Sequence, residues 1–197
     1  MKTPGATTNQ RAVQATLITF TLLASWLGMQ QVHELGHISA AMAIGAKIDL
    51  VALHPLTISH TDVGPNKHPL VVVWAGPLVG VLVPLAFWLA VSAARLTAAF
   101  LFRFFAGFCL VANGVYIGLG SFFAIGDCGE MLRNGSPIWS LWLFGVAATL
   151  AGFLLWNNQG GHFGFGTTRH PINHRLAVGV FLVFLALVAL GLSTGGR

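Results

Sequence analysis

The run AVQATLITFTLLASWLGMQQVHELGHISAAMAIGA, residues 12–46, is mostly apolar and lies between Arg11 and Lys47. A single helix of this length would measure roughly 50 Å at 1.5 Å per residue, whereas the hydrocarbon core of a bilayer is about 30 Å thick. We therefore expect a first membrane span over about residues 12–45, which must tilt, bend or protrude from the bilayer.

The composition of the whole chain supports this interpretation. Of its 197 residues 55% are hydrophobic and only 8% are charged, and the mean hydropathy is +0.78. Four more apolar runs, at about 70–93, 96–125, 138–156 and 176–192, have the length and composition of membrane-spanning helices. The sequence therefore predicts an all-α fold, a polytopic transmembrane helical bundle of about five spans in a lipid bilayer.

The segment KIDLVALHPLTISHTDVGPNKHP, residues 47–69, is too rich in proline and charge to span a membrane. We expect a loop with short β-strands here. Residues 1–197 are expected to form a single membrane-embedded domain without a soluble accessory domain. The net charge of +5 comes from scattered lysines and arginines rather than a basic run or helix face, so nucleic acid is not an expected partner.

The polar residues of the first span form the sequence His33-Glu34-Leu35-Gly36-His37. Two histidines four residues apart lie on one face of a helix, where both imidazoles can bind the same Zn²⁺. This is the H-E-x-x-H signature of zinc metalloproteases, in which the metal acidifies a water molecule and the glutamate is the general base. The pattern predicts His33 and His37 as metal ligands and Glu34 as the catalytic base.

Glu34 is the only acidic residue deep within an apolar run, and a carboxylate at mid-membrane costs about 2.5 to 3.5 kcal/mol. A metal ion is one compensating partner. The alternative is structural, with the two histidines and Glu34 joined in hydrogen bonds between helices.

A catalytic zinc keeps three protein ligands and one open position, so a third ligand must come from elsewhere in the chain. Asp127 is favoured because it follows the third span and is flanked by Gly126 and Gly129, which let backbone approach closely. Glu130 is the main competitor. Other candidates are Cys128, His54, His60, His68, His162, His170 and His174.

Three segments of the chain resemble the site-2 protease family of intramembrane zinc metalloproteases: HELGH followed by small residues, WAGPLVG at 74–80, and GDCGEML at 126–132. The resemblance covers about residues 30–133. It implies that His33, His37 and Asp127 hold one Zn²⁺ per chain, and that the G-x-x-x-G pattern of Gly76 and Gly80 lines the central helix. In the family the aspartate is usually followed by glycine, whereas Cys128 stands at that position here.

The resemblance also implies a function. We expect a multi-pass protein of the bacterial cell membrane that hydrolyses peptide bonds within or next to transmembrane segments of a protein substrate. Gly76, Gly80 and Asn113 are expected to contact that substrate, although an interhelical hydrogen bond is an equal interpretation of Asn113. The extended stretch 48–59 is expected to pair with the unwound substrate. The alternative function is a zinc-binding membrane protein without proteolysis, either a scaffold or a metal carrier.

Overall fold

The computed structural model describes residues 8–165 and 172–194. Five of its helices, α1, α2, α3, α5 and α6, are long and apolar enough to cross a bilayer, as an integral membrane protein requires. The expected transmembrane helical bundle with a strand-containing loop after its first span is thereby confirmed. The elements are α1 (Thr8–Ala43), β1 (Ile48–Ala52), β2 (His60–Val63), α2 (Pro69–Ala93), α3 (Ala99–Gly120), α4 (Gly126–Arg133), α5 (Ile138–Trp156), the 3-10 turn η1 (Gly160–Phe163) and α6 (His174–Thr194).

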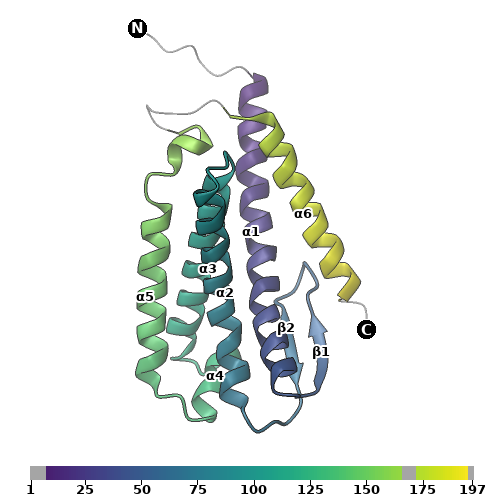
Figure 1. Ribbon diagram of the computed structural model, residues 1–197, viewed down its shortest axis with the longest axis vertical. Helices are drawn as coiled ribbons and strands as arrows, with labels where there is room; N and C mark the ends of the chain where they lie inside the picture. Colours follow the sequence, from purple (N-terminus) through teal and green to yellow (C-terminus); the bar gives the residue numbers. More distant parts are fainter. Residues whose placement is uncertain (1–7, 166–171, 195–197) are drawn as a thin grey trace.

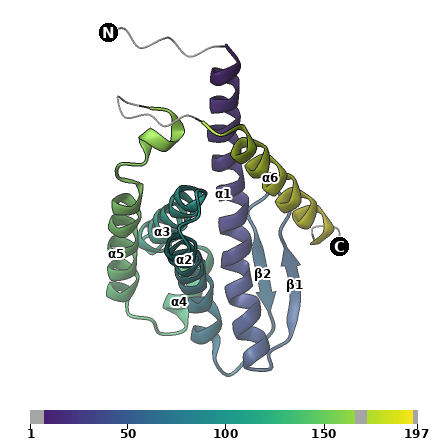
Figure 2. The same cartoon turned by 45° about the horizontal axis from the view of Figure 1, so that its top comes forward.

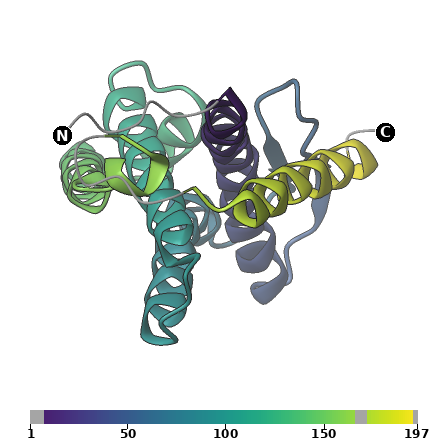
Figure 3. The same ribbon diagram turned by 90° about the horizontal axis from the view of Figure 1, so that it is seen from above.

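Helix α1 is the central element of the bundle (Figure 1). On one side it packs against α2 and α3, and α5 lies beyond them against α3; on the other side it contacts α6 and the β-hairpin. Figure 3 shows this order from above, with α1 between the two groups. The hairpin runs beside the lower part of α1, on the same side as α6 (Figure 2).

The predicted spans agree with the observed helices to within a few residues except at the end of the third. The span expected over 138–156 coincides with α5, but the span expected over 96–125 ends at Gly120. The backbone then turns, with left-handed φ values at Ala124 and at Gly126, the first residue of the short helix α4. The boundary was predicted wrongly because Phe122, Phe123 and Ile125 continue the apolar run through this turn.

Small residues let the spanning helices approach closely, as is common in membranes. Gly114 and Gly118 of α3 face Gly145 of α5, where an added Cβ would lie only 2.6 Å from the Cα of Gly118. On the other side of the bundle, Gly36 of α1 packs against the backbone carbonyl of Ala75 in α2. These contacts hold α3 close to α5 and α1 close to α2, and the candidate site lies where α1, α2 and α3 meet.

The two strands pair in antiparallel fashion, with Val51 opposite Thr61 and Ala52 opposite His60. Side chains alternate along such a chain, so that Ser59, Thr61 and Val63 share one face. These three side chains are partly buried against the rest of the protein, whereas His60 and Asp62 are exposed. The hairpin therefore presents two hydroxyl groups to α1.

Candidate metal centre

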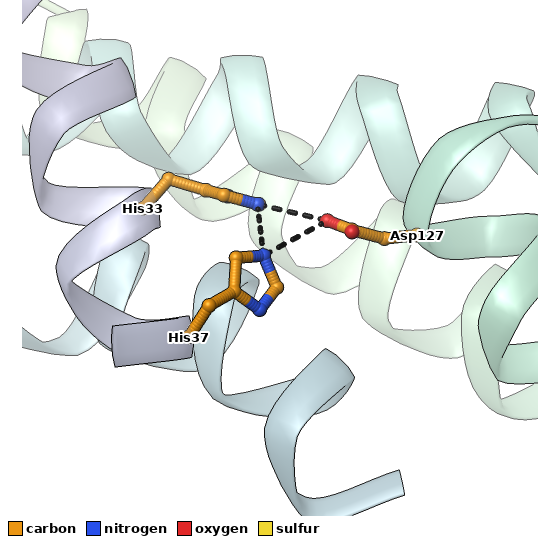
Figure 4. Close-up of side chains that lie close together, drawn as sticks. All are labelled: His33, His37 and Asp127. Atoms are coloured by element: carbon orange, nitrogen blue, oxygen red, sulfur yellow. Dashed lines mark hydrogen bonds and ion pairs between the residues drawn. The ribbon is translucent and has the colours of Figure 1, made fainter. Parts of the chain in front are cut away.

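The three predicted ligands, two from α1 and one from α4, meet in one place (Figure 4). The Nε2 of His33 lies 2.8 Å from the Oδ2 of Asp127 and 3.1 Å from the Nε2 of His37. The Nε2 of His37 lies 3.4 Å from the same Oδ2 of Asp127. Both histidines are buried, and Asp127 reaches them from the first turn of α4. Among the described residues, these three form a group that could hold a metal ion.

Hydrogen bonds on the far side of each ring determine which nitrogen carries the proton. The Nδ1 of His37 donates to the carbonyl oxygen of Val72 at 2.9 Å, because a carbonyl can only accept. The Nδ1 of His33 lies 2.7 Å from the Oδ1 of Asn113. The amide of Asn113 is oriented by its own Nδ2, which donates to the carbonyl oxygen of Cys109. In both neutral rings the proton is therefore on Nδ1, and Nε2 presents a lone pair.

Two imidazole lone pairs and a carboxylate oxygen thus point at one another and require a positive charge between them. A proton on one ring would satisfy a single pair of these atoms, whereas a metal ion accepts all three. The set fits zinc, which in catalytic sites takes three nitrogen and oxygen ligands at about 2.0 to 2.2 Å. Donor atoms at the corners of such a tetrahedron lie roughly 3.3 Å apart, close to the observed separations. The hydrogen bonds that both rings make through Nδ1, on the side away from this centre, are those that metal-binding histidines ordinarily make.

Tyr116 and Gly126 place the carboxylate of Asp127. The backbone N–H of Asp127 donates to the hydroxyl oxygen of Tyr116 at 3.0 Å, and a Cβ on Gly126 would overlap that hydroxyl. Gly126 also has a φ of +52°, which favours glycine. Burial of Asp127 opposes its ionisation, but whenever a neighbouring imidazole also carries a proton on Nε2, its hydrogen bond and positive charge lower the pKa of the Asp127 carboxyl well below the usual range. Asp127 is therefore available as an anionic ligand.

Glu34 lies one residue beyond His33 and only 3% of its surface is exposed. Its Oε1 accepts a hydrogen bond from the hydroxyl of Ser59 at 2.8 Å, and its Oε2 accepts one from Thr61 at 2.7 Å. From the sequence, Ser59 was expected only to end the stretch 48–59 that pairs with substrate, and Thr61 had no expected role. The one available signal was their spacing of two residues within the polar loop that follows H-E-x-x-H.

The competing candidates for the third ligand lie elsewhere. Glu130 forms an ion pair with Arg133 on an exposed face of α4, at 2.5 Å. The buried thiol of Cys128 faces the carbonyl oxygens of Tyr116 and Ile117, and burial, assisted by the charge of Asp127, raises its pKa to about 11. None of the loop histidines within the described residues joins the group, and His170 lies outside those residues.

The three residues expected to contact substrate lie next to the candidate metal ligands or to one another. Gly76 lies directly against the imidazoles of His33 and His37, and Gly80 lies against the amide of Asn113. Asn113 makes the interhelical hydrogen bond to His33 that was its alternative interpretation. These contacts give all three residues a structural role in the centre, and contact with substrate stays a prediction.

Comparison with known proteins adds no further assignment, because no protein-family model, curated protein or solved structure matches this chain.

Proposed function

We propose that this chain is an intramembrane zinc metalloprotease, which hydrolyses peptide bonds within or next to the transmembrane segments of other membrane proteins. The observation that carries the proposal is the convergence of His33, His37 and Asp127 beside Glu34, within a bundle of membrane-spanning helices. The three ligands leave a fourth zinc position for water or substrate. A carboxylate next to such a position is the arrangement that peptide hydrolysis by metalloproteases uses.

The chain's own residues can carry the proton transfers of this reaction. Zinc bound by His33, His37 and Asp127 would supply a Lewis acid, which polarises the peptide carbonyl and acidifies water. Glu34 takes the proton of the attacking water as the new C–O bond forms, and it delivers that proton to the amine nitrogen as the C–N bond breaks. Asn113 and the carbonyl of Val72 keep both imidazoles in the tautomer that leaves Nε2 free for the metal.

An apolar groove on the protein supports the proposal that the substrate is a membrane-embedded segment. A cavity of about 730 Å³ lies between α1, α3 and α6, and its lining includes Leu35 and Ile38 of α1 and Leu53 just after β1. Leu35 and Ile38 directly follow Glu34 and His37 in sequence, so the groove lies at the same level of α1 as the candidate centre but on another face of the helix. A helical substrate hides its carbonyls in backbone hydrogen bonds and must unwind before cleavage. Strand β1, with β2 on one edge only, offers main-chain groups to such an unwound segment.

The alternative of a metal carrier is less well supported. A carrier needs acidic or histidine side chains along several spans to form a path for the ion. Helices α2 and α5 contain neither, and α6 has only His174 at its first residue. A single fixed site favours catalysis, and Glu34 has no function in an inert scaffold.

The test is cleavage of a reporter membrane protein by the wild type and by Glu34→Gln, both purified, loaded with zinc and reconstituted in vesicles. The substitution keeps the size of the side chain and leaves His33, His37 and Asp127 in place. We expect Glu34→Gln to retain zinc and lose cleavage by at least about a hundredfold, the range in which general-base catalysis contributes. Equal cleavage by both proteins would show that Glu34 is not the base, and cleavage by neither would refute the protease.

A further inference from the structure

The β-hairpin is bound to the face of α1 that carries Glu34, through three hydrogen bonds. Ser59 and Thr61 each donate a hydroxyl proton to one oxygen of the Glu34 carboxylate, at 2.8 and 2.7 Å. The backbone N–H of Ser59 donates to the Oε1 of Gln30 at 2.9 Å, one helical turn before Glu34. Both oxygens of the proposed base are therefore held by residues outside α1.

Strand pairing alone does not require these contacts. Thr61 is opposite Val51 in the sheet, and the pairing between β1 and β2 involves only their backbones. An apolar residue at 59 or 61 would fit the same strand, as Val63 does two residues later, where it packs against the buried cluster around Ala40 and Ala41. Two hydroxyls at these positions indicate a specific partner, and that partner is Glu34.

The contacts leave the carboxylate able to act as a base. An ionised carboxylate has about four lone-pair sites on its two oxygens, and the two hydroxyls occupy two of them. One site on each oxygen stays free to accept a proton. Two donors on opposite oxygens also fix the plane of the carboxylate, whereas a glutamate side chain with no partners would exchange among rotamers.

We propose that Ser59 and Thr61 are positioning residues, which hold the carboxylate of Glu34 in the orientation needed for catalysis beside the metal centre. This inference rests on the proposed function. It makes the hairpin part of the catalytic apparatus, because any displacement of residues 59–61 displaces the base. A misplacement of about 1 Å in a catalytic group can cost as much as a hundredfold in rate.

The test compares the wild type with the double variant Ser59→Ala/Thr61→Val, in which only the two hydroxyls are lost. We expect kcat to fall at least about tenfold while KM changes less than about twofold, because substrate binding does not use these groups. Zinc content should be unchanged. Restoring one hydroxyl, in Ser59→Ala/Thr61→Ser, should recover much of kcat, which a general loss of packing would not allow.

A second readout does not depend on activity. The infrared difference spectrum between the wild type and Glu34→Gln isolates the carboxylate stretch of Glu34, and we expect this band to shift in the double variant. Thr16→Val is the matched control, because the Thr16 hydroxyl donates to the carbonyl of Ala12 near the start of α1, outside the site and the hairpin. It should change neither kcat nor the band.

The outcomes separate the two proposals. An unshifted band, or a double variant with the wild-type kcat, would overturn the positioning role. If the wild type cleaves no substrate, the proposed protease fails, and the infrared band alone then decides whether Ser59 and Thr61 hold Glu34: a shift supports this and an unchanged band refutes it.

Discussion

Gly76 of α2 faces the imidazole of His37 so closely that no Cβ fits between them. The two residues lie on adjacent helices, and the space that a side chain would fill is occupied by the ring edge that carries Nε2. The small-residue pattern of the second span therefore has a specific consequence beyond helix packing. It allows the Nε2 edge of His37 to lie against the backbone of α2, where the Nδ1 of His37 also donates to the carbonyl of Val72.

Replacing Gly76 with alanine should displace both imidazoles and weaken zinc binding. We expect an affinity at least about tenfold lower, comparable with the loss of one group that orients a ligand. Competition with a chromophoric chelator measures this. Gly179→Ala in α6 is the control, because nothing lies within 4 Å of the added Cβ there. Wild-type affinity in Gly76→Ala would mean that the histidines bind no metal in this arrangement.

Asn113 should contribute to metal affinity without touching the metal. Its Oδ1 accepts the proton on Nδ1 of His33, so Asn113→Ala removes the group that fixes the tautomer and ring orientation. Loss of such a partner typically costs about 10- to 100-fold in affinity. The same chelator competition applies, with Asn134→Ala as control, since Asn134 is a half-buried residue that contacts Glu130 and not the histidines. Equal effects of the two substitutions would contradict the role assigned to Asn113.

Cys128 should behave as an unreactive thiol and not as a metal ligand. Burial raises its pKa to about 11 from an ordinary value of 9.0. The thiolate is the reactive form, so at pH 8 its population is about a hundredfold lower than for an unperturbed cysteine. Alkylation followed by mass spectrometry should be slow in the folded protein, should accelerate as the pH rises toward 11, and should not be slowed by zinc. Protection by zinc would indicate that Cys128 is a ligand in place of Asp127.

Leu53 tests the prediction that the hairpin holds substrate by main-chain pairing. It follows Ala52, the last paired residue of β1, so Leu53→Pro removes one backbone donor without breaking a strand pair. If that donor binds substrate, cleavage efficiency should fall about fivefold, as for one hydrogen bond of ~1 kcal/mol. Leu53→Ala keeps the N–H and controls for the side chain. Undiminished cleavage by the proline variant would refute pairing at this position.

Much of the metal centre could be predicted from sequence because its spacing is local. His33 and His37 share a helix face whatever the fold, and Asp127 is one of few acidic residues near a span end. The hydrogen bonds around them could not be predicted. The carbonyl of Val72 has no sequence signal, and the contact of Thr61 with Glu34 depends on how the hairpin folds back on α1.

The boundaries of the spans show a related limit. Hydropathy located α5 correctly because Pro137 and Asn157 mark its ends, but it could not locate the end of α3. There the chain turns within an apolar segment whose phenylalanines remain exposed, Phe122 at 66% and Phe123 at 73%. Hydropathy indicates only that a segment prefers an apolar environment. The position of the turn depends on the backbone conformation at Ala124 and Gly126, which hydropathy does not reflect.

The most direct test of the metal centre is the zinc content of purified wild type, Asp127→Asn and Glu130→Gln after equilibration with the same limiting zinc concentration. Both substitutions convert a carboxylate of the same short helix into a neutral carboxamide. Of the two residues, only Asp127 lies within 3.4 Å of both histidines. We expect about one zinc per chain in the wild type and in Glu130→Gln, as for a three-ligand site, and little or none in Asp127→Asn. A wild type without zinc, or an Asp127→Asn variant that retains it, would contradict the assignment of His33, His37 and Asp127 as the metal centre.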